Sequence, residues 1–251
     1  MIIDTYCTAQ NRRGNSDYLN GEGNQKAGFN SQNMFNAMDS AGVEMAMICS
    51  LAQRIENDFI AEQCQSHPDR LIGFGQVKPG EDGAVEEVHR CAKMGLRGIK
   101  LHPSLHGYLF SDHGLLDPIF QACAEEKLIV IVNALDDAFV SPFGIEEIAK
   151  GYPEVPVIIA HMGAVWNVPD SITVAGRNTN VYLDTSATML IDVKNAYKRL
   201  GAKKILMGTE WPANDFDMER LKIRKAIPDE NDRALVEGGN LARLLGLDIE
   251  N

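Results

Sequence analysis

The chain has 251 residues, of which 45% are hydrophobic and 24% charged, an ordinary globular composition that can bury a sizeable core without disulfides. Its formal net charge is −11, so nucleic acid and anionic membrane surfaces are poor partners, because both attract clustered positive charge. These numbers favour a globular protein that acts on something other than a polyanion.

Eight short apolar segments of strand length recur along the chain, and helical spacing follows most of them. The predicted strands are 1–7, 43–50, 71–77, 96–102, 128–134, 156–162, 180–186 and 204–210. Most lack polar alternation, as is typical of parallel strands that are covered on both faces. The predicted helices are 33–42, 53–68, 84–95, 113–127, 144–153, 189–201 and 216–227, and residues 229–247 form one helix or a pair broken at Gly238–Gly239.

Strand–helix alternation repeated eight times over about 250 residues is typical of a single α/β domain, a (β/α)8 TIM barrel. We therefore predict that residues 1–251 form one such barrel. A doubly wound sheet is the alternative, but it normally uses fewer strands, and neither a Gly-x-Gly-x-x-Gly nor a P-loop motif supports nucleotide binding.

Residues 9–30 form a long polar segment between the first predicted strand and the first predicted helix, with four glycines and five asparagines. Long loops in compact domains are usually functional or disordered. This one leaves the carboxyl end of a barrel strand, where TIM barrels place their active sites. We predict that it covers the barrel mouth, with an ordinary surface excursion as the alternative.

Five cysteines without a Cys-x-x-Cys pair indicate reduced thiols rather than a disulfide framework. The N-terminus shows no basic segment followed by a long apolar one, so we expect no signal peptide. No apolar run approaches the roughly 18 residues of a membrane span. We therefore expect a cytoplasmic protein without a membrane partner.

In a barrel, the last residues of all strands converge on one opening. Here they form a polar set of mixed charge, which predicts a small-molecule site. The set comprises Tyr6, Thr8, Cys49, Ser50, Gln76, Lys78, Lys100, His102, Asn133, Asp136, Asp137, His161, Asp184, Ser186, Glu210 and Trp211.

Several segments, taken together and in this order, resemble the amidohydrolase-2 family over about residues 2–247. They are the Ile-Asp strand start, GIKLHP (98–103), IVIVNA (129–134), IIAHMG (158–163), VYLDTS (181–186), ILMGTEWP (205–212) and GGNLARLLGL (238–247). Members of that family are metal-dependent hydrolases and decarboxylases on a TIM barrel. The resemblance implies the same fold and a related activity here.

The family's metal-binding positions are substituted in this chain. Its first strand carries Ile-Asp-x-His-x-His, whose two histidines bind the metal, and here Tyr6 and Thr8 stand at those positions. The fifth strand of the family ends in a ligating histidine, where this chain has Asn133. The resemblance implies that His161 is the sixth-strand histidine and that Glu210 replaces the eighth-strand aspartate.

A catalytic zinc ion needs about three strong protein ligands. The five family positions retain only two such groups, His161 and Glu210, so we expect no cofactor. The alternative is an unusual Zn, Mn or Mg site built on these two and on the carboxylates Asp136, Asp137 and Asp184.

His161 and Glu210 are the candidate catalytic pair for proton transfer. A lone histidine on an apolar strand is also often a satisfied core residue, so position at the mouth and the family match favour the functional interpretation. Substrate contacts are expected from Tyr6, Thr8, Lys100, His102, Asn133, Asp184 and Trp211.

Two of these candidates keep structural alternatives. Lys100 could equally pair with an acid inside the barrel, and Asp184 could cap the next helix. A nucleophilic role for Cys7 is not expected, because no base is visibly paired with it.

The resulting hypothesis is a hydrolase or decarboxylase of a small carboxylated or cyclic substrate, with an altered or lost metal site. The alternative is a non-catalytic barrel that binds a small ligand or a partner protein. The sequence leaves a monomer or a homodimer open.

Overall fold

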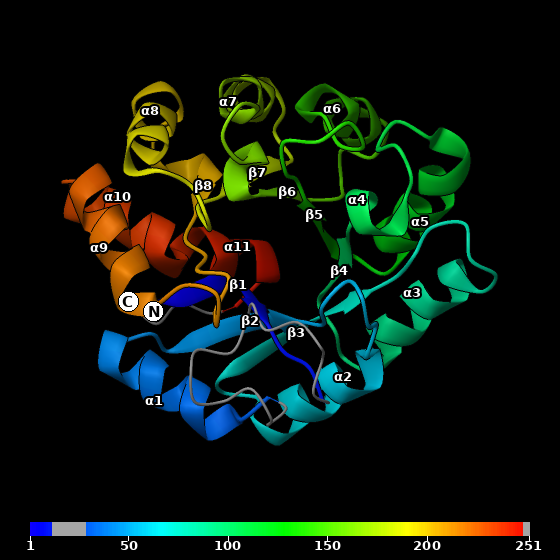
Figure 1. Ribbon diagram of the computed structural model, residues 1–251, viewed down its shortest axis with the longest axis horizontal. Helices are drawn as coiled ribbons and strands as arrows, with labels where there is room; N and C mark the ends of the chain where they lie inside the picture. The colour runs from blue at the N-terminus through cyan, green and yellow to red at the C-terminus, as the bar shows by residue number, and fades with distance from the viewer. Residues whose placement is uncertain (12–28, 248–251) are drawn as a thin grey trace.

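Eight parallel strands form the centre of the computed structural model, which describes residues 1–11 and 29–247 (Figure 1). Each strand pairs in parallel with the next along the chain, in the order β1 to β8. The strands are β1 (Ile3–Thr8), β2 (Met45–Cys49), β3 (Leu71–Gln76), β4 (Gly98–Leu101), β5 (Ile129–Asn133), β6 (Val157–Ala160), β7 (Val181–Asp184) and β8 (Ile205–Leu206). All eight predicted strands are confirmed, and with them the (β/α)8 barrel.

The ring closes through the segment that follows β8, because β8 itself has only two residues. The backbone amide of Thr5 donates to the carbonyl oxygen of Met207 at 2.8 Å, and that of Glu210 donates to Tyr6 at 2.6 Å. A further bond of 2.8 Å runs from the Thr8 amide to the Trp211 carbonyl. The last strand therefore continues as irregular backbone and delivers Glu210 beside the end of β1.

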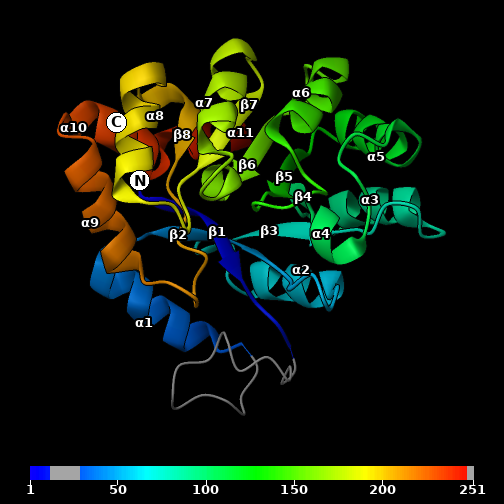
Figure 2. The ribbon, with the colours of Figure 1, turned by 45° about the horizontal axis from the view of Figure 1, so that its top comes forward.

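Helices surround the strand ring in chain order (Figures 1 and 2). They are α1 (Ser31–Ala41), α2 (Asn57–Ser66), α3 (Ala84–Lys93), the single turn α4 (Pro103–His106), α5 (His113–Glu125), α6 (Pro142–Gly151), α7 (Val168–Arg177), α8 (Leu190–Leu200) and α9 (Phe216–Ala226). The C-terminal segment is a broken pair, with α10 (Glu230–Ala234), a π-helical turn (Leu235–Gly239) and α11 (Asn240–Leu245). The predicted helices are confirmed to within a few residues, and the predicted break falls at the glycine pair.

The single turn α4 and the helix α7 were not expected from the sequence, and the longer of the two is α7. It contains the β-branched residues Val168, Ile172, Thr173 and Val174 and a proline in its first turn, so its intrinsic helix propensity is low. Four of its apolar side chains are buried (Val168, Ile172, Val174 and Ala175). Tertiary packing of that face therefore stabilises a helix that local preference does not favour.

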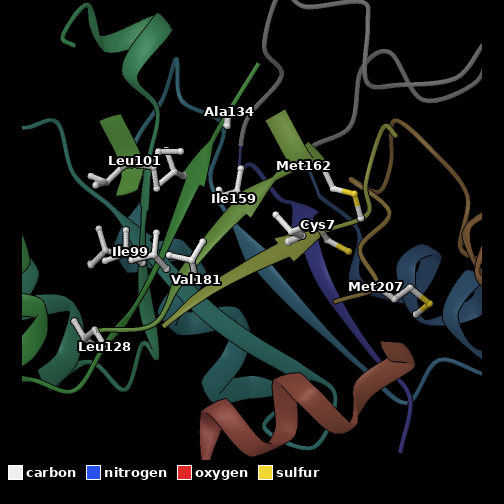
Figure 3. Close-up of a cluster of buried hydrophobic side chains, with 14 of the residues drawn as sticks. Cys7, Ile99, Leu101, Leu128, Ala134, Ile159, Met162, Val181 and Met207 are labelled. Atoms are coloured by element: carbon white, nitrogen blue, oxygen red, sulfur yellow. The ribbon is translucent and has the colours of Figure 1, made fainter. Parts of the chain in front are cut away.

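The apolar core has two layers, one inside the ring and one between the ring and the helices. Side chains of the outer layer include Ile99 and Leu101 of β4 and Ile159 of β6 (Figure 3). The inner layer includes Ile131 and Phe74, and α11 closes it at the end where the strands begin. Because side chains alternate along a strand, Lys100 lies between two outward neighbours and must point into the ring.

A bulge in β1 decides which of its residues face the interior. The register with β2 shifts between Asp4 and Cys7, so that one strand gains an extra residue. As a result Ile3 and Tyr6 both belong to the inner layer, although they are three residues apart, and Cys7 belongs to the outer one. The bulge thus aims the phenol of Tyr6 into the barrel.

The prediction that residues 9–30 cover the mouth falls mostly on residues 12–28, which lie outside the described residues. Within the described parts of the chain, no helix is both long enough and apolar enough to cross a membrane.

Candidate active site

A pocket of about 270 Å³ lies at the carboxyl ends of the strands. Six of the residues predicted for the site border it. Its lining consists of Tyr6, Thr8, Leu51, Ala52, Gln53, Lys100, His102, Leu105, Asn133 and Glu210. Four lining residues were not predicted: Leu51, Ala52 and Leu105, which form an apolar wall, and Gln53. They follow strands β2 and β4, and nothing in the local sequence distinguishes them from ordinary loop residues.

Lys100 places a buried ammonium group at the floor of this pocket. Its side chain is only 2% exposed, and its Nζ donates to the carbonyl oxygen of Ser50 at 3.3 Å. Nζ also lies 5.1 Å from the ring centre of Tyr6, close enough for a cation–π contact. Within the described residues Lys100 forms no ion pair, so the predicted alternative of an internal acid partner is not what the structure shows. A buried charge without a partner is costly, which favours an anionic ligand here.

Tyr6 and Asn133 meet beside Lys100 on the floor of the pocket. The Tyr6 hydroxyl donates to Asn133 Oδ1 at 2.8 Å, and both side chains are buried. Burial raises the pKa of Tyr6 well above its ordinary value, so the phenol stays protonated and neutral. The two side chains thus form a hydrogen-bonded pair at two of the family's metal positions.

Glu210 is the carboxyl group that borders the pocket. It is partly exposed, and its Oε1 lies 3.9 Å from Nε2 of the fully buried His161. Burial raises the pKa of Glu210 to about 7, with Lys100 opposing the shift. Burial, and next Lys100, lowers the pKa of His161 to about 4. At neutral pH the imidazole is therefore uncharged, while the carboxyl group holds a proton part of the time.

The backbone at both members of this pair adopts the left-handed region, which side-chain-bearing residues rarely occupy. The φ angle is 58° at His161 and 62° at Glu210. Such conformations cost of order 1–3 kcal/mol each and persist where the surrounding structure imposes them, often at functional sites. The two residues of the predicted pair are neighbours. Glu210 borders the pocket, and His161 lies on the side of Glu210 away from it.

His102 borders the pocket as an uncharged ring. Burial and the neighbouring Lys100 lower the pKa of His102 to about 3. Its Nδ1 accepts the backbone amide of Leu105 at 3.4 Å, so the ring caps α4 and orients the loop. His106 lies nearby and contacts the Gln76 side chain and the Ala52 carbonyl.

Asp184 and Trp211 are predicted substrate contacts that the structure places away from the pocket lining. Asp184 is fully buried and accepts the backbone amide of His161 at 3.1 Å, so it caps no helix in the way the alternative proposed. Trp211 stacks on Phe216 with ring centres 6.3 Å apart. These positions depend on neighbours from other elements, such as Phe216 of α9, and the sequence alone does not reveal those contacts.

Asp136 and Asp137, which were considered as extra metal ligands, are used in loops. Asp136 accepts the backbone amides of residues 165–167 at 2.7–3.1 Å. Asp137 bonds to the Ser104 hydroxyl and to the Phe139 amide. These bonds hold the loops after β5 and β6. They account for both carboxylates as structural groups, so no bound metal is needed to explain them.

The family model described as amidohydrolase matches residues 27–247. The chain belongs to the amidohydrolase family. This confirms the resemblance seen in the sequence, and membership of an enzyme family supports the prediction of an enzyme. No curated protein matches the chain.

Solved structures of other proteins share the fold. A TIM-barrel protein from Bordetella bronchiseptica has a TM-score of 0.80 at 19% identity, covering 98% of both chains. A dihydroxybenzoic acid decarboxylase from Polaromonas sp., solved with manganese and 2-nitroresorcinol, has a TM-score of 0.79 at 18% identity, covering 99% of this chain and 98% of the other. A 2,6-dihydroxybenzoate decarboxylase solved with 2,6-dihydroxybenzoate has a TM-score of 0.77 at 18% identity, covering 98% of both. At these identities the similarity concerns the fold.

The residues at the family's metal positions do not fit a divalent metal. Tyr6 and Asn133 satisfy each other, the phenol of Tyr6 is held neutral by its raised pKa, and the Thr8 hydroxyl donates to the Trp211 carbonyl at 3.3 Å. That leaves His161 and Glu210, which is fewer than the three strong ligands of a catalytic metal site. Across the parts of the chain that the structure describes, no three His, Cys, Asp or Glu residues are grouped to hold a metal ion.

Proposed function

We propose that this amidohydrolase-family protein is a decarboxylase of a small hydroxylated cyclic carboxylic acid. The observation that carries the proposal is Glu210, an acid with a pKa raised to about 7 that faces a pocket beside the buried ammonium of Lys100. A carboxyl group that keeps its proton near neutral pH is suited to general acid catalysis.

The pocket supports a substrate with one ring and one negative charge. Its volume of about 270 Å³ is slightly below the range of roughly 300–1,000 Å³ typical of drug-sized ligands. Lys100 supplies a single buried positive charge, and His102 stays neutral because its pKa is lowered to about 3. Fold relatives that decarboxylate dihydroxybenzoates act on acids of this size, which agrees with the proposal.

The chemistry replaces carbon dioxide by a proton. Glu210 transfers its carboxyl proton to the ring carbon that bears the carboxylate, and a C–H bond forms there. The bond between that carbon and the carboxylate then breaks, its electron pair returns to the ring, and neutral CO2 leaves. Lys100 balances the substrate's charge, the apolar wall receives CO2, and Glu210 takes a new proton from water. No step requires a metal ion.

The same site suggests how hydrolysis would differ. Activation of water needs the ionised form of Glu210 as a general base, so hydrolysis would rise with pH as that group loses its proton. A decarboxylase that uses the protonated form falls over the same pH interval. The direction of the pH profile therefore separates the two reactions.

The test is turnover of a panel of hydroxybenzoates, other cyclic carboxylic acids and lactones, followed as CO2 release and as ring opening. We expect CO2 release from at least one hydroxylated acid, with unchanged rates after EDTA treatment or addition of manganese. Lys100→Met is expected to lower kcat/KM about 10- to 100-fold, because a hydrogen bond to a charged group contributes roughly 1.5–3 kcal/mol.

Lys93→Met is the matched control, since Lys93 is exposed on α3, and it should behave like the unsubstituted protein. Loss of activity in EDTA with recovery on manganese would overturn the metal-free chemistry. Ligand binding that depends on Lys100 without turnover of any compound would favour the non-catalytic barrel instead. That alternative is supported by the substitution of the family's metal positions at Tyr6, Thr8 and Asn133.

A further inference from the structure

His161 is held from behind by two buried side chains at the end of β7. Its Nδ1 lies 2.9 Å from the hydroxyl oxygen of Ser186. That hydroxyl in turn bonds to Asp184 Oδ2. His161 is 1% exposed and the other two are fully buried, so water does not compete for these bonds. The three groups form a chain that leads from the barrel wall to the imidazole.

The direction of each hydrogen bond in this chain follows from the groups around Asp184. Its Oδ2 accepts the backbone amide of His161 at 3.1 Å and that of Ser186 at 3.3 Å. Because an amide can only donate, Oδ2 acts as an acceptor. The single hydroxyl hydrogen of Ser186 therefore points to Asp184, and a lone pair of its oxygen faces His161.

A lone pair facing Nδ1 requires that this nitrogen carry the hydrogen. The neutral imidazole then leaves Nε2 bare. On that side Nε2 faces two oxygens, Asn133 Oδ1 at 3.3 Å and Glu210 Oε1 at 3.9 Å. In this tautomer Nε2 presents a lone pair toward the Glu210 carboxyl group, where it can orient the carboxyl hydrogen of the protonated acid.

We infer that Ser186 and Asp184 are positioning residues that fix His161 as the Nδ1-protonated tautomer, with Nε2 turned toward Glu210. The catalytic part of this inference rests on the proposed role of Glu210 as the acid at the pocket. The other titratable and charged groups around His161 are Tyr6, which meets its ring edge-on with centres 5.2 Å apart, and the cations Lys100 and Lys222, which act on it through space.

The surroundings of Asp184 leave space for its carboxylate at this position. Its second oxygen, Oδ1, has no hydrogen-bond partner among the residues that the structure describes, and a side chain at Gly208 would overlap that oxygen. The absence of a side chain at residue 208 thus leaves room for the Asp184 carboxylate beside His161. Neither Ser186 nor Asp184 borders the pocket, so their effect on a substrate must pass through His161.

The test is nitrogen-15 NMR of the histidine rings in the intact protein, which reports the tautomer without any substrate. The signals of His161 are identified by their loss in His161→Gln. We expect Nδ1 to be protonated and Nε2 to be bare at pH 7.5. In Ser186→Ala the acceptor of the Nδ1 hydrogen is gone, and the ring should change to the Nε2-protonated tautomer, which can donate to Asn133.

Thr188→Ala is the matched control, because Thr188 is a neighbouring buried hydroxyl that bonds to the Thr185 carbonyl and not to His161. It should leave the tautomer unchanged. Asp184→Asn keeps an acceptor oxygen in place and should also preserve the Nδ1-protonated form, so it serves if Ser186→Ala does not fold. An Nε2-protonated ring in the unsubstituted protein, or in Asp184→Asn, would overturn the inference.

Kinetics provide the second readout. Where a substrate is turned over, Ser186→Ala should lower kcat about 10- to 100-fold, the usual effect of removing an outer positioning partner, with KM unchanged. Loss of kcat without a change of tautomer would overturn the positioning role while leaving the proposed function intact. The expected tautomer change in a protein that decarboxylates nothing would instead overturn the proposed function alone.

Discussion

Lys100 determines the electrostatics of the pocket at the scale of single residues. It is the buried cation at the floor, and it opposes charge on both neighbouring histidines, His102 and His161. It also favours ionisation of Glu210, yet burial dominates and the pKa of that group remains at about 7. Burial, reinforced by Lys100, thus keeps the two histidines neutral, and burial leaves Glu210 a proton that is available near neutral pH.

The pH dependence of turnover follows from Glu210. Its pKa is raised to about 7 from an ordinary value of 4.5, so the protonated, active form predominates below pH 7 and is lost above it. We expect kcat for decarboxylation to be constant near pH 6 and to fall about tenfold per pH unit above the pKa. A pH profile of kcat measures this.

Glu210→Gln cannot donate an acidic proton and should abolish turnover at every pH, whereas the exposed Glu125→Gln on α5 should not change the profile. A rate that stays level or increases between pH 7 and 8.5 would contradict general acid catalysis by Glu210.

Among the secondary-structure elements, β4 packs closely against its two neighbouring strands at Gly98. Gly98, two residues before Lys100 in β4, is paired with Phe74 of β3 and Ile129 of β5. A Cβ atom at Gly98 would overlap the Phe74 ring and the Ile129 carbonyl oxygen. The absence of a side chain there allows the aromatic ring to lie across the strand inside the barrel.

We expect Gly98→Ala to lower the free energy of unfolding by about 1–3 kcal/mol, because overpacking in a close-packed core costs that much. Urea denaturation measures the change. Gly151→Ala is the matched control, since a Cβ at Gly151 meets no atom within 4 Å, and alanine suits its helical position at the end of α6. Equal stability of Gly98→Ala and the unsubstituted protein would show that the barrel interior repacks freely.

At the scale of the whole molecule, buried acids couple stability to pH. Burial raises the pKa of Asp4 to about 8, that of Asp184 to about 6 and that of Glu219 to about 7. For each, the unfolded chain releases its proton at a lower pH than the folded protein does. Their contribution to stability is therefore greatest in acid and decreases as the pH rises through the folded pKa.

Asp4→Asn isolates this effect, because the amide resembles the protonated carboxyl group in shape and charge. The unsubstituted protein should lose stability relative to Asp4→Asn between pH 4 and 8, by several kcal/mol, since each pKa unit corresponds to about 1.4 kcal/mol. Thermal unfolding at pH 5 and pH 8 measures the difference. The exposed Asp82→Asn should show no such pH dependence, and a constant difference for Asp4→Asn would contradict the raised pKa.

The residue pattern alone predicted the barrel and most of the residues that line the pocket. Short apolar segments that alternate with segments of helical spacing identify eight strands. The carboxyl ends of barrel strands meet at one opening regardless of loop conformation, and Tyr6, Thr8, Lys100, His102 and Asn133 all border the pocket there. Local signals failed at α7, whose helix depends on burial of its apolar face.

The roles of the site residues became visible only in the folded chain. It placed His161 behind Glu210 and outside the pocket lining, showed Lys100 without an ion pair among the described residues, and joined Asp184 to His161 through Ser186. The physical reason is that burial, pKa and hydrogen-bond direction depend on neighbours from other strands. Those neighbours are distant in the sequence and become adjacent only when the ring closes.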